Sequence, residues 1–297
     1  MNIKSDFVGR KSKPLTIKIS ERDALNYSAG CYISNPVFYD NREKLLVFPM
    51  FVVSLTWKIS SSFREFWDTS GFPLDSLYTQ VHYLENLTWY RNIFAGEVIT
   101  IVGEVIGIIP HISGTLLCIE YKGYSQQGKE VFNEITCSLL RGIKCTDKGK
   151  GRERFPVVNK GDWNNAEFLW EEPIEISPYD PYIYDGCSNI HFPIHISRKF
   201  AENVGLPGPI YQGTAILSRV LQKFLEKQEY APEYKFIKSL HARFASYITP
   251  GSKLILKVLK PNNGEERKEI YFFEIYDLYN KSIVKEGKVE FADITSI

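Results

Sequence analysis

The chain shows the same order of predicted elements twice, and this repeat constrains its fold more than any single segment does. A strand, a helix region, a long apolar segment and four further strands occur in residues 15–141 and again in residues 174–290. Self-similarity of this kind indicates duplicated structural units. Each half is therefore predicted to form one antiparallel sheet wrapped around one helix, which is an α+β architecture.

Short motifs echo one another at corresponding places in the two halves. The first copy reads ISERD, followed by Tyr27 and then Gly30-Cys31, and the second reads ISPYD, followed by Tyr184 and then Gly186-Cys187. An aromatic residue, a tight glycine turn and a strand also recur in both halves. The echo supports a duplication that extends over most of the chain.

A polar segment separates the two halves. Lys, Gly, Arg, Asp and Asn dominate residues 145–165, without an apolar period, as in a linker. The predicted organisation is an N-terminal repeat of residues 1–147, a linker of residues 148–168 and a C-terminal repeat of residues 169–297.

Apolar periodicity locates the individual elements. Residues 20–30 are predicted to form a short helix with Ser20 as its N-cap. Leu45–Trp57 is apolar throughout, so periodicity alone leaves strand and helix open, but its place in the repeat favours a central helix. Its counterpart is the helix Thr214–Leu225, which has one apolar stripe. Strands are predicted at residues 15–19, 81–89, 97–109, 115–124 and 130–141, and at 174–176, 238–245, 253–260, 269–278 and 282–290. The last four strands of the first half are predicted to form an antiparallel meander.

The composition narrows the function classes. A formal net charge of +1 provides no global basic field, so nucleic acid is not an expected partner. No apolar run approaches the roughly 20 residues that span a bilayer, and the N-terminus lacks the apolar core of a secretory signal, which predicts a cytoplasmic protein. Five cysteines without paired spacing favour reduced thiols over a disulfide framework.

Residues suited to catalysis gather in Tyr184–Gly213. His191 and His195 lie four residues apart, and Gly213 begins the most regular predicted helix. A polar loop at a helix N-terminus suits acyl chemistry, because unpaired N–H groups and the positive end of the helix dipole meet there. The two histidines could instead bind a metal, but Pro193 disfavours a regular helix between them and no third ligand is near, so neither metal nor cofactor is predicted. A further alternative is that His195 is simply satisfied by hydrogen bonds within the loop.

The same stretch resembles the signature segment of the MaoC-like, or hydratase 2, family. The matching residues are Tyr184, Ser188, Pro193-Ile194-His195, Phe200-Ala201, Gly205-Leu206-Pro207-Gly208-Pro209-Ile210 and Gln212-Gly213. Residues 22–27, 47–51 and 94–96 resemble the N-terminal repeat of double-hotdog members. The resemblance implies a double hotdog, with two antiparallel sheets each wrapped around a central helix, in which one chain forms an internal pseudo-dimer. It leaves a homodimer open.

Members of this family are (R)-specific enoyl-CoA hydratases and dehydratases of fatty acid metabolism, so the resemblance implies a hydro-lyase. Its substrate would be an acyl-CoA or an acyl-carrier thioester. Hydration needs a base for water, an acid for C2 and donors for the thioester oxygen. His195 matches the catalytic histidine of the family, and Gly213 matches the glycine whose N–H serves the oxyanion. Gly208, Pro209 and Gln212 border the thioester arm in the family and are the candidate substrate-binding residues.

The sequence departs from the family pattern Asp-x-Asn-Pro-x-His. When His195 is aligned, Ile190 stands at the Asp position and Phe192 at the Asn position. An isoleucine cannot accept a proton, so the usual Asp–His pair is absent.

Three nearby residues are candidate substitutes for the missing pair, namely His191, Asn189 and Asp185, and His191 with His195 is the favoured combination. The alternative is a catalytically inactive acyl-thioester-binding protein or partner subunit, and a thioesterase of the same fold is a third interpretation. The first repeat has no histidine in the matching loop, and it is expected to be non-catalytic and to accommodate the acyl tail.

Overall fold

The computed structural model describes residues 1–158, 163, 166–228, 230–261 and 269–294. Its α-helices are α1 (Glu21–Gly30), α2 (Val52–Ser61), α3 (Phe63–Phe66), α5 (Asp180–Ser188), α6 (Arg198–Asn203) and α7 (Gly213–Lys227). Short 3₁₀ helices occur at Ser5–Phe7, Pro36–Phe38, Pro49–Phe51, Leu74–Thr79, Arg152–Arg154 and Pro193–His195. The first repeat contains the strands β1 (Asn2–Ile3), β2 (Leu15–Lys18), β3 (Gln80–Trp89), β4 (Val98–His111), β5 (Gly114–Ser125), β6 (Glu130–Arg141) and β7 (Lys144–Cys145). The second contains β8 (Ala166–Glu175), β9 (Lys235–Phe244), β10 (Lys253–Pro261), β11 (Glu269–Asp277) and β12 (Ser282–Asp293).

Ten strands form one continuous antiparallel sheet in the order β2-β4-β5-β6-β3-β9-β12-β11-β10-β8. Both halves follow the same path in this sheet, because β2 and β8 are outermost and the strands that follow them in the chain, β3 and β9, are innermost. The two inner strands, β3 and β9, pair with each other and join the halves. The predicted α+β duplication is confirmed. Among the four strands of the first half that were predicted to form a meander, β3 lies beside β6 and β9 rather than β4, and the meander consists of β4, β5 and β6.

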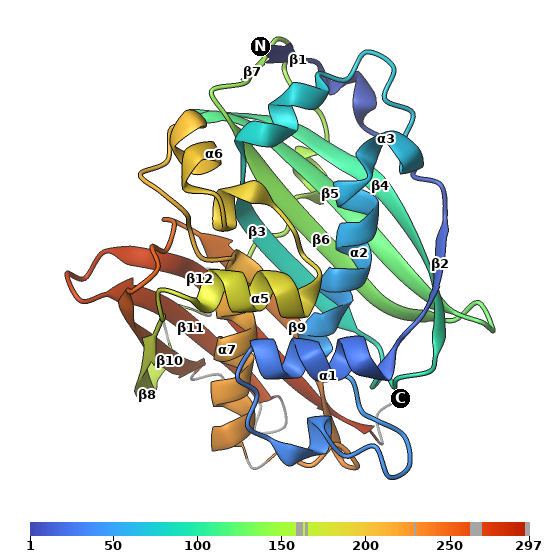
Figure 1. The fold of residues 1–297 in the computed structure, drawn as a ribbon, viewed down its shortest axis with the longest axis vertical. Coiled ribbons are helices and arrows are strands. Elements are labelled where there is room, and N and C mark those ends of the chain that lie inside the picture. The colour runs from blue at the N-terminus through green and yellow to red at the C-terminus, as the bar shows by residue number, and fades with distance from the viewer. Residues whose placement is uncertain (159–162, 164–165, 229, 262–268, 295–297) are drawn as a thin grey trace.

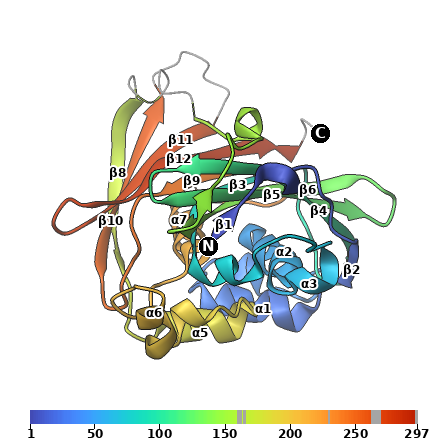
Figure 2. The same cartoon turned by 90° about the horizontal axis from the view of Figure 1, so that it is seen from above.

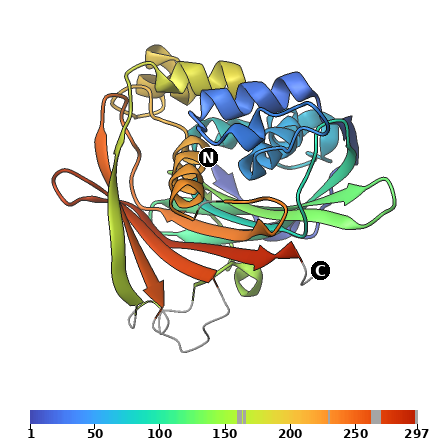
Figure 3. The same ribbon diagram turned by 90° about the horizontal axis from the view of Figure 1, so that it is seen from below.

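The helices lie on one face of this sheet in two layers (Figures 1–3). The sheet curls around α2 and α7, and α1 and α5 run side by side across them on the side away from the sheet. A central helix inside a curved sheet must be apolar on most of its surface, and α7 buries nine of its residues. The predicted helix in Leu45–Trp57 is confirmed from Pro49 onward, whereas Leu46 still pairs with Phe94 as an isolated bridge.

The contact between α1 and α5 joins the two repeats at their echoed motifs. Tyr27 and Tyr184 are fully buried, and their hydroxyl groups are 3.1 Å apart. A Cβ atom on Gly30 would lie 2.4 Å from the Cβ of Cys187, so only glycine permits the two helices to pack this closely. Its counterpart in the echo, Gly186, is exposed and has no such neighbour.

Two further predictions, on the cysteines and on the linker, differ from the structure. A disulfide joins Cys118 and Cys137, which face each other across β5 and β6, so the expectation of reduced thiols is wrong for this pair. Of the predicted linker 148–168, residues 159–162 and 164–165 lie outside the described residues, and Ala166 already begins β8. The strand is therefore longer than residues 174–176, because it pairs with the whole of β10.

Candidate functional site

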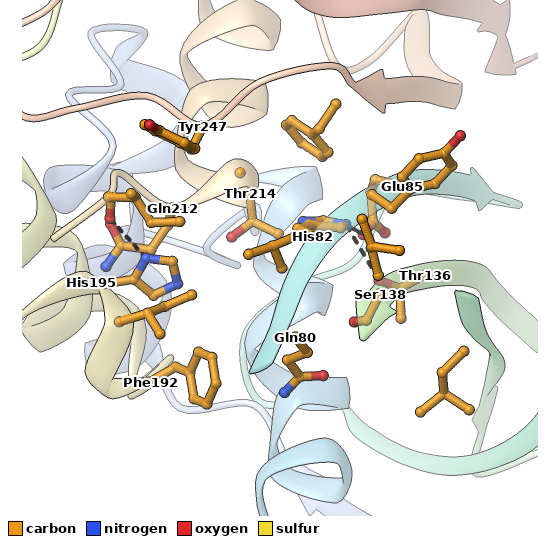
Figure 4. A pocket seen from close by; sticks show the side chains of 18 of the residues that line it. Gln80, His82, Glu85, Thr136, Ser138, Phe192, His195, Gln212, Thr214 and Tyr247 are labelled. Carbon is orange, nitrogen blue, oxygen red and sulfur yellow. Dashed lines mark hydrogen bonds and ion pairs between the residues drawn. The ribbon is translucent and has the colours of Figure 1, made fainter. Parts of the chain in front are cut away.

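A cavity of about 610 Å³ lies where the two repeats meet. One side is formed by α2, β3 and β6 of the first repeat. The other side comes from the second repeat and is formed by Ile190, Phe192, Ile194, His195, Gly205, Leu206 and residues 210–214 and 243–248. Trp57, Phe192 and Phe244 provide aromatic surface in the lining. Figure 4 shows polar side chains of the same lining, among them those of Gln80, His82 and Thr214. This size and this mixture of apolar walls with few polar groups are typical of small-molecule sites, which measure roughly 300–1,000 Å³.

His195 lines this cavity at the end of the 3₁₀ helix Pro193–His195. Its Nδ1 donates a hydrogen bond of 2.8 Å to the carbonyl oxygen of Ile210, and the N–H of Ile210 returns a bond of 3.1 Å to Ile194. A carbonyl can only accept, so the ring proton is on Nδ1 and Nε2 carries a lone pair. The second bond holds the two segments together and fixes the orientation of the ring.

Burial lowers the pKa of His195 to about 4, although its bond to the Ile210 carbonyl opposes the shift. The imidazole is therefore neutral at pH 7, with Nε2 able to accept a proton. A histidine in this state is suited to act as a general base toward a water molecule in the cavity.

Gly213 brings a helix N-terminus to the same cavity. A Cβ atom at this position would lie 2.8 Å from the ring of Phe244 and 2.9 Å from Nδ1 of His82, so a larger residue does not fit without displacement. The first N–H groups of α7 have no partner within the helix, and the positive end of its dipole lies here. Such an N–H group suits the developing negative charge on a thioester oxygen.

Gln212 is the third predicted residue that lines the cavity. Its buried side-chain amide donates to the carbonyl of Pro181 at 2.9 Å, which ties the start of α7 to α5. Gly208 and Pro209 are not among the lining residues, whereas Gly205 and Leu206 of the same turn are.

The predicted partners of His195 lie elsewhere. His191 is 64% exposed in its side chain and donates from Nδ1 to Asp185 at 2.7 Å, and neither residue lines the cavity. Asn189 ends α5 in the left-handed conformation, with φ of 59°, and is also outside the lining. The structure therefore brings His195 and Gly213 to one cavity, but it does not bring His191, Asp185 or Asn189 to it.

Apolar groups occupy the positions where the family carries its Asp and Asn. Ile190 is 6% exposed and packs in the main core, and it forms part of the cavity wall. Phe192 lies edge-on to His195, with ring centroids 6.1 Å apart. This wall has no carboxylate that could orient His195.

The carboxyl groups that line the cavity come from the first repeat instead. Glu85 on β3 and Glu134 on β6 are both almost fully buried, and His82 lies beside them, with its Nε2 2.9 Å from Oε2 of Glu85. Sequence reasoning missed these three residues, because no motif marks them. The signal available in the sequence was an acidic residue at an inner position of each of two predicted strands, 81–89 and 130–141.

Within the described residues, no group of three or more His, Cys, Asp and Glu side chains has an arrangement that could hold a metal ion. In the same part of the chain, no helix is both long enough and apolar enough to cross a membrane.

Comparisons with known proteins agree with this architecture. Residues 163–277 match the family model described as the MaoC like domain. A MaoC-like dehydratase from Phytophthora capsici superposes with a TM-score of 0.76 at 21% identity, over 95% of this chain and 96% of that one. Full-length peroxisomal multifunctional enzyme type 2 from Drosophila melanogaster gives a TM-score of 0.71 at 15% identity, over 95% of this chain and 48% of that one.

A conserved hypothetical protein from Mycobacterium tuberculosis with a double hotdog fold gives a TM-score of 0.63 at 11% identity, over 96% of each chain. No curated protein sequence matches the chain. Similarities at these identities concern the fold, and they confirm the double hotdog predicted from the sequence.

Proposed function

Since the second repeat is a MaoC-like domain within a double hotdog fold, we propose that the protein catalyses the reversible hydration of a 2-enoyl thioester, or the dehydration of a 3-hydroxyacyl thioester. The observation that carries this proposal is that His195 and Gly213 line one cavity, with the ring proton of His195 held on Nδ1. The thioester would be carried by coenzyme A or by an acyl carrier protein.

Each of the two groups has a chemical role in the proposed hydration. Nε2 of His195 takes a proton from water, and the water oxygen bonds to C3 of the enoyl group. The electrons of the double bond then move toward the thioester carbonyl, whose oxygen accepts a hydrogen bond from the N–H of Gly213. A donor must finally protonate C2, and the apolar side chain of Ile190 cannot supply that proton.

The direct test is the hydration of crotonyl-CoA, followed by the loss of the absorbance of the conjugated thioester. We expect turnover by the wild-type protein, and we expect His195→Gln to reduce kcat by about 10²-fold or more, because the loss of a general base has effects of roughly 10²–10⁴. His241→Gln is a matched control, because His241 is also buried but lies outside the cavity lining. Turnover that survives His195→Gln would refute the assignment of the base.

A second candidate function follows from Ile190, whose place in the wall leaves His195 without a neighbouring carboxylate. The protein would then bind acyl thioesters without converting them. Titration calorimetry with crotonyl-CoA, beside the turnover assay, separates the two functions. Binding without turnover on short, medium and long enoyl chains would favour the second.

A further inference from the structure

The cavity holds a second histidine, which comes from the first repeat. His82 is on β3, and it forms a cluster with Glu85 of the same strand and Glu134 of β6, here named the His82 cluster. A β-bulge at Tyr83 sets its geometry, because His82 is opposite Ser138 while Leu84 is opposite Cys137. Residues three apart in a regular strand point to opposite faces, but the extra residue of the bulge turns His82 and Glu85 to the same face.

The contacts of His82 show which of its nitrogens is free to act in the cavity. Nε2 lies 2.9 Å from Oε2 of Glu85, 3.1 Å from the carbonyl oxygen of Leu84 and 3.3 Å from Oγ1 of Thr136. Nδ1 is on the other side of the ring, 2.9 Å from the place where a Cβ of Gly213 would be. A carbonyl can only accept, so the ring proton of His82 is on Nε2, and Nδ1 has its lone pair on the side of the proposed oxyanion site.

The carboxyl groups behind His82 are held in their protonated form. Burial raises the pKa of Glu85 to about 8, and burial together with the nearby Glu85 raises the pKa of Glu134 well above its ordinary value. Oε2 of Glu85 lies 2.9 Å from Nε2 of His82, on the side of the ring away from Gly213. Neutral carboxyl groups at Nε2 leave the His82 ring itself neutral, with the lone pair of Nδ1 free.

His82 and His195 occupy opposite sides of Thr214 in the view of Figure 4. They are close enough that a positive charge on His82 lowers the pKa of His195. Protonation of one imidazole therefore disfavours protonation of the other. Burial also lowers the pKa of His82 to about 4, and it is therefore neutral in the resting protein. Two neutral imidazoles, each with a lone pair toward one cavity, suit a reaction in which one takes a proton from water and the other receives that proton and passes it on.

We propose that His82 is a second catalytic acid/base residue, contributed by the first repeat, whose Nδ1 delivers the proton to C2 of the substrate in hydration and takes it in dehydration, while Glu85 holds the ring at Nε2. This inference rests on the proposed function, and it supplies the group that Ile190 cannot provide. The first repeat, expected from the sequence to be non-catalytic, would then provide one of the two catalytic imidazoles.

In hydration, Nε2 of His195 takes a proton from water as the water oxygen bonds to C3. That proton passes through water in the cavity to Nδ1 of His82, and from Nδ1 to C2 as the thioester C=O re-forms, which leaves both imidazoles neutral again. One water is consumed, one C–O bond and one C–H bond form at C3 and C2, and no other reactant is required.

Kinetics of crotonyl-CoA hydration test the role of His82. We expect His82→Gln to reduce kcat by about 10²-fold or more while KM changes little, because the ring acts on the reacting carbon rather than on the carrier. His241→Gln again serves as the control, since His241 is buried on the adjacent strand β9, beside Asn86 and outside the cavity lining. A wild-type kcat in His82→Gln would overturn the proposal, and it would leave the proposed function intact if His195→Gln were inactive.

The pH profile tests the positioning residue Glu85 even if its variants are less stable. We expect wild-type kcat/KM to change near pH 8, because the charge that Glu85 gains there raises the basicity of the His82 ring beside it, and we expect kcat/KM of Glu85→Gln to stay level across this range. The other titratable groups around the His82 cluster are Glu134 on β6, Tyr121 on β5 and His195. The same change near pH 8 in Glu85→Gln would overturn the role of Glu85. Absence of turnover by the wild-type protein would overturn both this inference and the proposed function.

Discussion

Substitution of Gly213 by alanine tests the fit of the cavity most directly. The added methyl carbon would lie 2.8 Å from Phe244 and 2.9 Å from His82, whereas ordinary contact begins at 3.4 Å, so about 0.6 Å of displacement is needed. Neither neighbour moves freely, because Phe244 packs against the core and His82 is held by three contacts.

The expected magnitude follows from two opposing effects. Overpacking of this kind costs about 1–3 kcal/mol. Alanine is a better helix former than glycine by up to about 1 kcal/mol in a helix interior, and by less at a first position. We therefore expect Gly213→Ala to lower the free energy of unfolding by about 1–2 kcal/mol. A displacement near 1 Å in a catalytic site costs about 10²-fold in rate, so kcat is expected to fall by roughly 10- to 100-fold.

The control is Gly186→Ala. Gly186 is an exposed helical glycine in α5 and has no neighbour within 4 Å, so alanine is expected to stabilise the protein by about 0.5–1 kcal/mol. Urea unfolding measures both stabilities, and crotonyl-CoA hydration measures the rate. If Gly213→Ala matched the wild type in both measurements, the assignment of Gly213 as the residue that contacts the substrate would be refuted.

Three further outcomes are expected. Glu85→Gln should gain stability relative to the wild type as pH rises from about 5 to 8. The raised pKa of Glu85 makes the folded wild-type protein bind a proton that the unfolded chain has already released, so the wild type loses stability over this range. Urea unfolding measures the difference, and the absence of a trend with pH would mean that the carboxyl is ionised in the folded state. Tyr27→Phe should cost about 1–3 kcal/mol of unfolding free energy, since it removes a buried hydroxyl that lies 3.1 Å from that of Tyr184, and a change below the error of urea unfolding would contradict this. His191→Ala should reduce turnover far less than His195→Gln, because His191 lies outside the cavity lining, and equal losses of kcat would support the original pairing of the two histidines.

The order of elements could be predicted because it depends on local patterns. The stripe of Thr214–Leu225 requires a helix, and the duplicated order placed Leu45–Trp57 in the same role although its own periodicity was ambiguous. Element bounds were less accurate where tertiary pairing extends a strand, as in β8, which continues along β10 beyond the apolar residues that marked it. The position of β3 in the centre of the sheet also depends on β9, a strand far away in the sequence.

The sequence by itself determined the duplication, the two central helices and the candidate groups His195 and Gly213, because these lie in contiguous segments with a recognisable pattern. Only the tertiary structure decided what stands opposite them. His82 and Glu85 share a face because of a bulge, and they meet the second repeat because β3 pairs with β9. A bulge leaves no mark in residue spacing, and contacts between residues more than 100 positions apart depend on how the two halves of the sheet join. The pairing that we propose across the repeats therefore becomes visible only in three dimensions.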